Sequence, residues 1–249
     1  LYLTLSRQQY WHTDDVERLM QFGYSSSWKR LSWNVSWSYS NTARQGTGNN
    51  NASDNTSEQI YMLSLSVPLS GWWGNSYATY SVSQNDNSGS SHQLGLSGTA
   101  LERNNLSWNL MQSYNSHDDE VGGNMSLTYD GTYGTVNGSY NYSQNSQRLN
   151  YGIRGGILAH SEGVTLSQEL GETIALVKAP GAAGLEIDNM RGAATDWRGY
   201  TVKTQLNPYD ENRVAISDNY FSKSNIELDN TVVTMVPTRG AVVKAEFVT

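Results

Sequence analysis

The sequence predicts an all-β protein: an antiparallel transmembrane β-barrel portion of about ten strands, residues 1–157, followed by a small β-sandwich domain, residues 158–249. Three observations lead to this prediction. Polar and apolar residues alternate along the first segment, short and long connections alternate between its strands, and its aromatic residues are abundant. Seven of the eight Trp and thirteen of the sixteen Tyr precede residue 158. Aromatic and small polar residues with little Leu, Val or Ile suit a wall that has lipid on one face and water on the other.

Alternation with a period of two is typical of a strand with two different faces. It is clearest in residues 31–40, where Leu, Trp, Val, Trp and Tyr at odd positions alternate with Ser and Asn at even positions. Most of the predicted strands approach the roughly 9–11 residues that a tilted strand needs to cross a bilayer. Their expected ranges are 1–11, 19–27, 31–40, 58–69, 76–83, 92–100, 105–114, 123–129, 133–143 and 149–157.

The connections between these strands give a second indication, because every second one is expected to be short. Outer-membrane barrels have short turns on the periplasmic side and longer loops outside. The short connections, which we therefore expect to face the periplasm, are 28–30, 70–75, 101–104 and 130–132. Trp residues gather near strand ends, as interfacial girdles do; these are Trp11, Trp28, Trp72 and Trp73.

Composition excludes several classes of protein. The 249 residues include no cysteine, so there is no disulfide framework and no thiolate ligand or nucleophile. Hydrophobic residues make up 37%, and no run of about 20 apolar residues predicts a transmembrane helix. The net charge of −7 is spread over both segments, so a nucleic-acid partner is not expected. Leu1 lies inside an alternating pattern and Thr249 directly follows another, so we expect both ends to be cut from a longer chain.

The second segment has a different composition, with few aromatic residues and with Pro and Gly between short runs of β-branched residues. Short strands at regular spacing are typical of a small β-sandwich. The expected strands are 164–166, 173–178, 185–189, 199–206, 213–216, 225–229, 232–236 and 241–247. Valine is the main candidate for the core; the residues are Val232, Val233, Val236, Val242 and Val243.

Two groups have the residue types of a metal site: His12, Asp14 and Asp15, and His117, Asp118, Asp119 and Glu120. Both fall in predicted outside loops, where charged residues are ordinary, and a metal site needs convergent ligands with a second shell. We therefore expect no metal and no cofactor. The nucleophile elbow GxSxG is absent, so no catalytic residue is expected.

The most characteristic cluster of the second segment is Asp196, Trp197, Arg198 and Tyr200. One hypothesis is a surface that faces a partner. The other, which we favour, is an internal Arg–Asp pair with aromatic rings capping the sandwich. Arg213 and Arg239 leave the same two alternatives open, so partner-binding residues stay unassigned.

Both segments of the sequence resemble the outer-membrane ushers of the chaperone–usher pilus pathway. The second segment resembles the first carboxy-terminal periplasmic domain of these ushers, and the Ser-, Tyr- and Trp-rich strands, including YLTLSRQQYW (2–11), resemble the end of the usher barrel. The resemblance of the second segment rests on four stretches: GVTLSQELGETIALVKAPGAAG (163–184), TDWRGYTV (195–202), PYDENRV (208–214) and ELDNTVVTMVPTRGAVVKAEF (227–247).

The resemblance implies a fimbrial usher porin in the outer membrane, with the second domain in the periplasm. Such a protein receives chaperone–pilus subunit complexes, supports subunit polymerisation by strand exchange and passes the fibre through its barrel; it is not an enzyme. The resemblance places the amino-terminal, plug and last carboxy-terminal domains outside this chain. Two alternatives stay open: a general outer-membrane porin with a periplasmic appendage, and a soluble β-rich adhesin. The adhesin would have to keep an apolar face exposed to water.

Overall fold

The computed structural model describes residues 1–9, 16–44, 54–70, 74–86, 88–217 and 229–248. Every element of regular secondary structure within these residues is a β-strand. Within these ranges no helix has the length and apolar character needed to cross a membrane. The predicted all-β class is confirmed.

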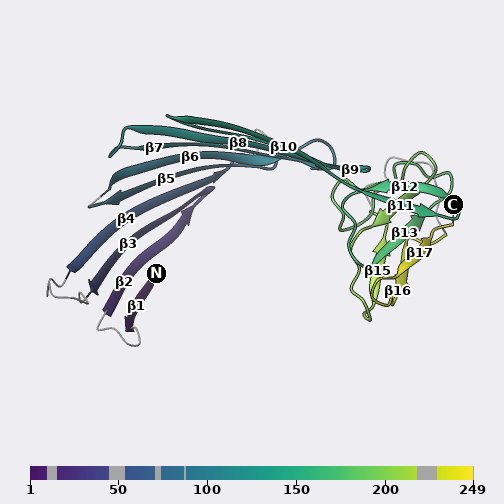
Figure 1. The fold of residues 1–249 in the computed structure, drawn as a ribbon, viewed down its shortest axis with the longest axis horizontal. Coiled ribbons are helices and arrows are strands. Elements are labelled where there is room, and N and C mark those ends of the chain that lie inside the picture. The colour runs from purple at the N-terminus through teal and green to yellow at the C-terminus, as the bar shows by residue number, and fades with distance from the viewer. Residues whose placement is uncertain (10–15, 45–53, 71–73, 87, 218–228, 249) are drawn as a thin grey trace, which may run out of the picture. The chain divides into compact units, whose positions relative to one another are not determined.

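The first ten strands form one antiparallel sheet in which neighbours in the chain are neighbours in space (Figure 1). All ten predicted strands are present, and β1 and β10 are the two edges of the sheet. The strands are β1 (Tyr2–Gln9), β2 (Val16–Trp28), β3 (Leu31–Arg44), β4 (Asp54–Pro68), β5 (Ser76–Asn85), β6 (Gly89–Ala100), β7 (Leu106–Asn115), β8 (Glu120–Gly131), β9 (Gly134–Ser143) and β10 (Ser146–Arg154).

The predicted alternation of short and long connections fails in the second half of the sheet. Residues 116–119 and 144–145, expected to belong to long loops, are no longer than the connection at 101–105. The physical reason is that strand pairing continues into the polar segments, where Ser, Asn and Gln still make ladder hydrogen bonds. Hydrophobic alternation marks only the part of each strand that has two unlike faces.

The last strand of the sheet also ends earlier than predicted, at Arg154 rather than at residue 157. Gly155 separates it from β11 (Gly156–His160), which pairs with β12 (Gly163–Ser167) in a separate hairpin. A Cβ at Gly155 would lie 3.0 Å from the carbonyl oxygen of Ser167 and 3.1 Å from that of Tyr133. The close approach of three backbone segments explains why this break falls at a glycine.

The remaining strands build two small sheets. One has the order β14 (Tyr200–Lys203), β13 (Ile174–Lys178), β17 (Val242–Glu246), and the other pairs β15 (Asn212–Ala215) with β16 (Val232–Met235). β13 pairs with β17 in parallel and with β14 in antiparallel orientation. Strands β11–β17 and the segments between them are called the soluble part below.

The core of the soluble part is built mainly from residues before the predicted valines. Its buried residues include Val177, Leu185 and Val214 before the valines and Phe247 after them, and Val233 and Val243 pack against this core half-buried. Val236 and Val242 are 65% and 56% exposed, so their prediction as core residues is wrong. In β17 the alternation places Val243 and Ala245 inward and Val242 outward, because successive side chains point to opposite faces.

The structure divides into two compact units. One comprises residues 1–98, 109–125 and 140–148, and the other comprises residues 99–108, 126–139 and 149–249. The second unit therefore contains the soluble part together with the ends of several strands of the large sheet. The division of the chain into domains after residue 157 stays a prediction.

Candidate functional site: a two-faced wall and an ion-pair clamp

The strand register of the large sheet sorts its side chains into two unlike faces. Residues directly opposite each other in a ladder share a face. One such row runs across four strands as Trp33, Leu65, Tyr80 and Leu94. The next row along the same strands is Asn34, Ser64, Ser81 and Gln93. The register therefore aligns the alternating residues of neighbouring strands, and the sheet has one apolar and one polar surface.

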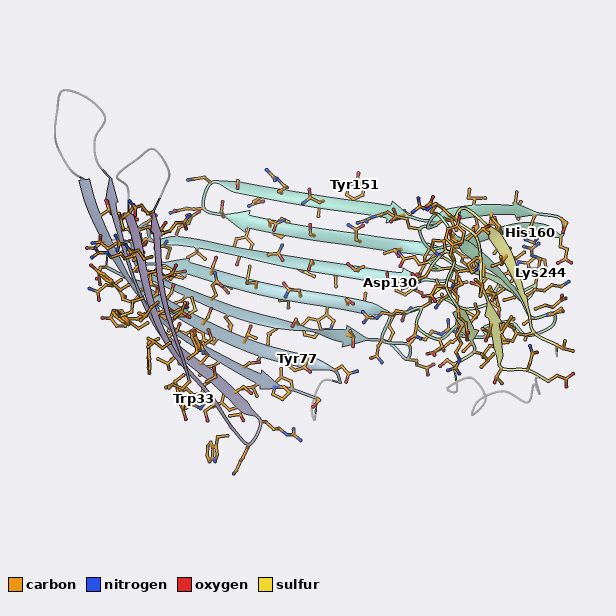
Figure 2. The ribbon with its side chains drawn as sticks, turned by 90° about the horizontal axis from the view of Figure 1, so that it is seen from below. Trp33, Tyr77, Asp130, Tyr151, His160 and Lys244 are labelled. Atoms are coloured by element: carbon orange, nitrogen blue, oxygen red, sulfur yellow. The ribbon has the colours of Figure 1, made fainter. Side chains whose placement is uncertain are left out.

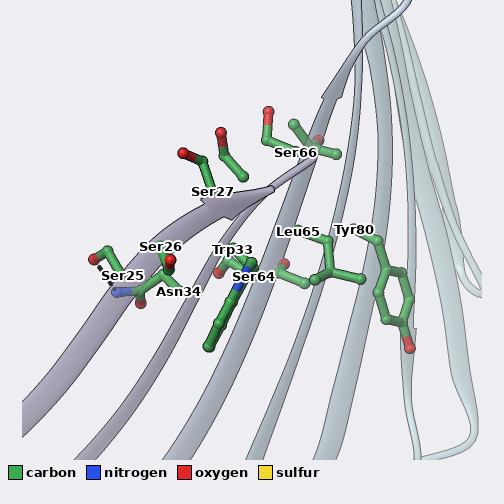
Figure 3. A pocket seen from close by; sticks show the side chains of 12 residues that line it. Ser25, Ser26, Ser27, Trp33, Asn34, Ser64, Leu65, Ser66 and Tyr80 are labelled. Atoms are coloured by element: carbon green, nitrogen blue, oxygen red, sulfur yellow. Dashed lines mark hydrogen bonds between the residues drawn. The ribbon is translucent and has the colours of Figure 1, made fainter. Parts of the chain in front are cut away.

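Figure 3 shows this division at a hollow of about 510 Å³ that twelve residues of β2–β5 line. Trp33, Leu65 and Tyr80 point to one side of the strands, and Ser27 and Ser66 to the other (Figure 3).

Polar groups on both faces have partners within the sheet. On the polar face, the Asn34 amide donates to the Ser25 hydroxyl at 2.9 Å. On the apolar face, the Tyr80 hydroxyl lies 2.8 Å from Nδ1 of His92. These pairings reduce the cost of placing polar atoms beside a membrane.

Large apolar side chains on the apolar face are exposed, which a soluble protein avoids. Leu3, Leu5 and Leu94 are 63%, 65% and 53% exposed. Trp28 lies at the end of β2 with the Lys29 ammonium 5.0 Å from its ring centroid, as expected for an interfacial residue. Trp11, Trp72 and Trp73 lie outside the described residues.

The predicted Arg–Asp pair of the soluble part is confirmed. Arg198 Nη2 lies 3.4 Å from Asp196 Oδ2, and the Asp196 side chain is 7% exposed. Asp196 also accepts hydrogen bonds from the backbone amides of Arg198 and Tyr200, at 2.8 and 2.9 Å. The Arg198 guanidinium lies over the Tyr200 ring, 5.2 Å from its centroid. This arrangement fastens the start of β14.

The expected aromatic cap is only half correct. Tyr200 is 9% exposed and belongs to a small buried cluster with Ile174, Leu176 and Val202. Trp197 is 79% exposed, and its ring contacts the Arg198 guanidinium at 5.7 Å. The indole projects outward because the turn at Asp196–Gly199 reverses the chain before β14.

A cluster that the sequence did not reveal lies beside this pair. The Lys178 ammonium is 2.7 Å from Glu162 and 3.3 Å from Glu246, and Lys244 lies 3.8 Å from Glu162 and 3.3 Å from Glu246. The Tyr200 hydroxyl donates to Glu162. We call these five residues the clamp, because they join the β11–β12 turn to β13, β14 and β17. Figure 2 marks two residues of this region, His160 and Lys244.

The clamp shifts the protonation of its members. Hydrogen bonds from Lys178 and Tyr200 lower the pKa of Glu162 from 4.5 to about 2. The hydrogen bond to Glu162 raises the pKa of Lys178. The same carboxylate raises the pKa of the Tyr200 hydroxyl. The only sequence sign of the clamp was the spacing of Lys244 and Glu246, which places both on one face of a strand.

The other sequence candidates take ordinary positions. Arg239 lies 3.7 Å from Glu172, and both side chains are about two-thirds exposed. Arg213 is an exposed residue of β15, opposite Thr234. Surface pairs of this kind contribute little to stability.

Of the two metal candidates, one can be placed. His117 lies 4.0 Å from Asp118, whereas Asp119 accepts a hydrogen bond from Tyr114. In the described part of the chain, no group of three or more His, Cys, Asp or Glu side chains is arranged to hold a metal. His12, Asp14 and Asp15 lie outside it.

Comparison with known proteins gives consistent matches over nearly the whole chain. The family described as "Outer membrane usher protein" matches residues 1–247. The probable outer membrane usher protein ElfC of Escherichia coli K12 is 42% identical over 99% of this chain and 29% of its own length. The outer membrane usher protein FimD of the same strain is 39% identical over 99% of this chain and 28% of its own length.

Among solved structures, a cryo-EM structure of an E. coli P pilus tip assembly intermediate, PapC–PapD–PapK–PapG, contains a similar chain. The TM-score is 0.67 at 21% identity, over 98% of this chain and 29% of that chain. This likeness shows that the two chains share a fold. The chain spans about three-tenths of the length of these relatives.

Proposed function

Because the chain belongs to the outer membrane usher family, we propose that it forms part of a pilus assembly platform in the bacterial outer membrane. In this proposal the protein receives chaperone–pilus subunit complexes in the periplasm. It supports polymerisation of the subunits by strand exchange and passes the fibre through its barrel. The work is transport and assembly, without covalent chemistry.

The observation that carries the proposal is the family match over residues 1–247, which includes the two-faced wall and the soluble part together. A general porin needs only the wall. The polar face, rich in Ser and Asn, supports the role of a hydrated channel lining that does not adhere to a passing protein. The apolar face suits the lipid of the outer membrane.

Strand exchange needs no nucleotide, because its driving force is β-augmentation. An incoming strand gains main-chain hydrogen bonds, and pockets for alternate side chains decide which strand fits. In this proposal the described chain contributes a channel wall and a holding surface for the complex.

The first test uses the soluble part alone, beginning at Gly156 so that β11 keeps its pairing with β12. It is titrated by calorimetry with a purified chaperone–pilin complex and, separately, with the chaperone alone. Circular dichroism and a cooperative thermal transition establish that the piece is folded. We expect selective binding of the complex.

Two outcomes count against the proposal. Equal binding of chaperone and complex would remove the selectivity that a holding surface needs. A folded piece that binds neither, together with solute conductance by the whole protein but no fibre assembly, would favour a porin.

A further inference from the structure

Within the second unit, one loop of the soluble part lies against the turns that end the strands of the large sheet. The loop spans residues 184–194. The other side of the contact comprises the connection 101–105 with the start of β7, and the end of β8 with the connection 132–133 and the start of β9. Asp130, labelled in Figure 2, lies at this contact. The contact is built from an ion pair, a backbone approach and a bridging amide, which are described in turn.

The ion pair joins Arg103, in the turn between β6 and β7, to Glu186. The Arg103 Nε lies 2.9 Å from Glu186 Oε1, and the two side chains are 34% and 27% exposed. Arg103 Nη2 also donates to the carbonyl oxygen of Gly184 at 3.5 Å. One guanidinium therefore holds both the side chain and the backbone of the loop.

The backbone approach centres on Gly192. Two hydrogen bonds join Asn105 to Asp130. The backbone N–H of Asp130 donates to the backbone carbonyl of Asn105 at 2.8 Å, and the side-chain amide of Asn105 donates to the backbone carbonyl of Asp130 at 2.9 Å. Asn105 is 5% exposed. Gly192 rests on this pair so closely that an added Cβ would lie 1.8 Å from the Asp130 oxygen. Backbone blocks the space, so rotation of a side chain cannot relieve the clash.

The bridging amide belongs to Gln168, which directly follows β12. Its Nε2 donates to the carbonyl oxygens of Gly131, in the large sheet, and Arg191, in the loop, at 3.2 and 2.8 Å. Arg191 in turn donates to the Ser107 hydroxyl at 3.1 Å. We call Arg103, Asn105, Asp130, Gln168, Glu186 and Gly192 the seat.

We infer that Arg103, Gln168 and Gly192 are positioning residues, which fix the soluble part against the strand ends so that it presents a bound complex in one place. This inference rests on the proposed function. The chain itself joins the two through Gly155 and Gly156, and Gly155 packs against the backbone of Ser167 and Tyr133. The seat adds contacts away from this joint, so the soluble part is held at more than one point.

The test compares Gly192→Ala with Gly240→Ala. Both glycines have left-handed backbones, with φ of +73° and +76°, so alanine is strained equally at the two positions. Gly240 has nothing within 4 Å of an added Cβ. The difference between the variants therefore isolates the clash with Asp130.

The position of the soluble part is read by electron paramagnetic resonance. Spin labels are attached at Tyr133→Cys and Val236→Cys, which are 55% and 65% exposed, in a chain that has no cysteine of its own. The whole protein in a lipid bilayer is used. We expect a narrow distance distribution that Gly192→Ala broadens and Gly240→Ala leaves unchanged. An unchanged distribution in both variants would overturn the seat.

Charge exchange tests the role in assembly. Arg103→Glu and Glu186→Arg are each expected to lower the number of fibres per cell at least threefold, and the double variant is expected to restore it. Normal assembly by a variant whose distance distribution is broadened would overturn the positioning role. Failure of the unmodified protein to assemble fibres, with the narrow distribution intact, would instead contradict the proposed function.

Discussion

Glu162 lies at the turn between β11 and β12 and accepts hydrogen bonds from Lys178 and from Tyr200. These bonds stabilise its ionised form more than burial opposes it, and its pKa falls to about 2. A carboxylate whose pKa is lowered on folding contributes stability above its unfolded pKa and loses it as the pH falls through its folded pKa. The raised pKa of Lys178 matters at alkaline pH, because the stability that this ammonium contributes is lost only as the pH rises above 10.5.

We therefore predict that the soluble part loses stability as the pH falls from 4.5 towards 2, and that Glu162→Gln removes a share of this dependence. Glu162→Gln is expected to be less stable than the unmodified protein at pH 7, with the two converging near pH 2. Urea unfolding at several pH values measures both. Glu169→Gln, whose carboxylate lies 3.8 Å from Arg154 on the exposed surface, is the control. Parallel curves for Glu162→Gln and the unmodified protein would contradict this account.

Trp197 is the exposed aromatic residue beside the clamp, and exposed Trp residues often dominate binding to a partner. We predict that Trp197→Ala weakens binding of a chaperone–pilin complex by about tenfold, equivalent to about 1.4 kcal/mol, and shifts the free energy of unfolding by less than about 0.5 kcal/mol. Tyr209→Ala, at a residue 72% exposed, is the control. Calorimetry gives the affinity, and equal losses in the two variants would argue against a specific role for Trp197.

At the scale of a strand, β4 places neighbouring residues in unlike surroundings. Leu63 is paired with Val35 and Val82 on the apolar face, and Ser64 is paired with Asn34 and Ser81 on the polar face. A cation on the lipid side of a membrane strand costs about 2–4 kcal/mol near the bilayer midplane, whereas a cation on the lumen side remains in water.

This predicts that Leu63→Arg destabilises the barrel by about 2–4 kcal/mol, and that Ser64→Arg leaves its stability nearly unchanged. Urea-dependent folding into lipid vesicles, followed by gel mobility, measures the difference. If Ser64→Arg proved the more harmful of the two, the assignment of the faces would be reversed.

At the scale of the whole molecule, sequence patterns predicted the structural features that depend on residues close together in the chain. Alternation located all ten strands of the large sheet, because one side chain in two must meet lipid. The Arg198–Asp196 pair was also predictable, since its partners are two residues apart and the aspartate caps its own turn.

Features that join distant segments were not predictable in this way. The clamp needs Glu162, Lys178 and Glu246, and the seat needs Arg103 and Glu186. Nothing in the local pattern of either segment specifies its partner. The prediction of the connection lengths failed for a different reason, because main-chain pairing continues where hydrophobic alternation stops.

The parallel pairing of β13 with β17 has a consequence for the timing of folding. Leu176 lies beside Lys244, although most of the soluble part separates them along the chain. A chain that crosses a membrane from its amino end delivers β13 early and β17 late, and long-range parallel pairing is slow. The soluble part therefore completes the three-stranded sheet β14–β13–β17 only after β17 has arrived. Until then one edge of β13 is unpaired and open to misassociation, and a quality-control factor that shields β-strand edges would act during this interval.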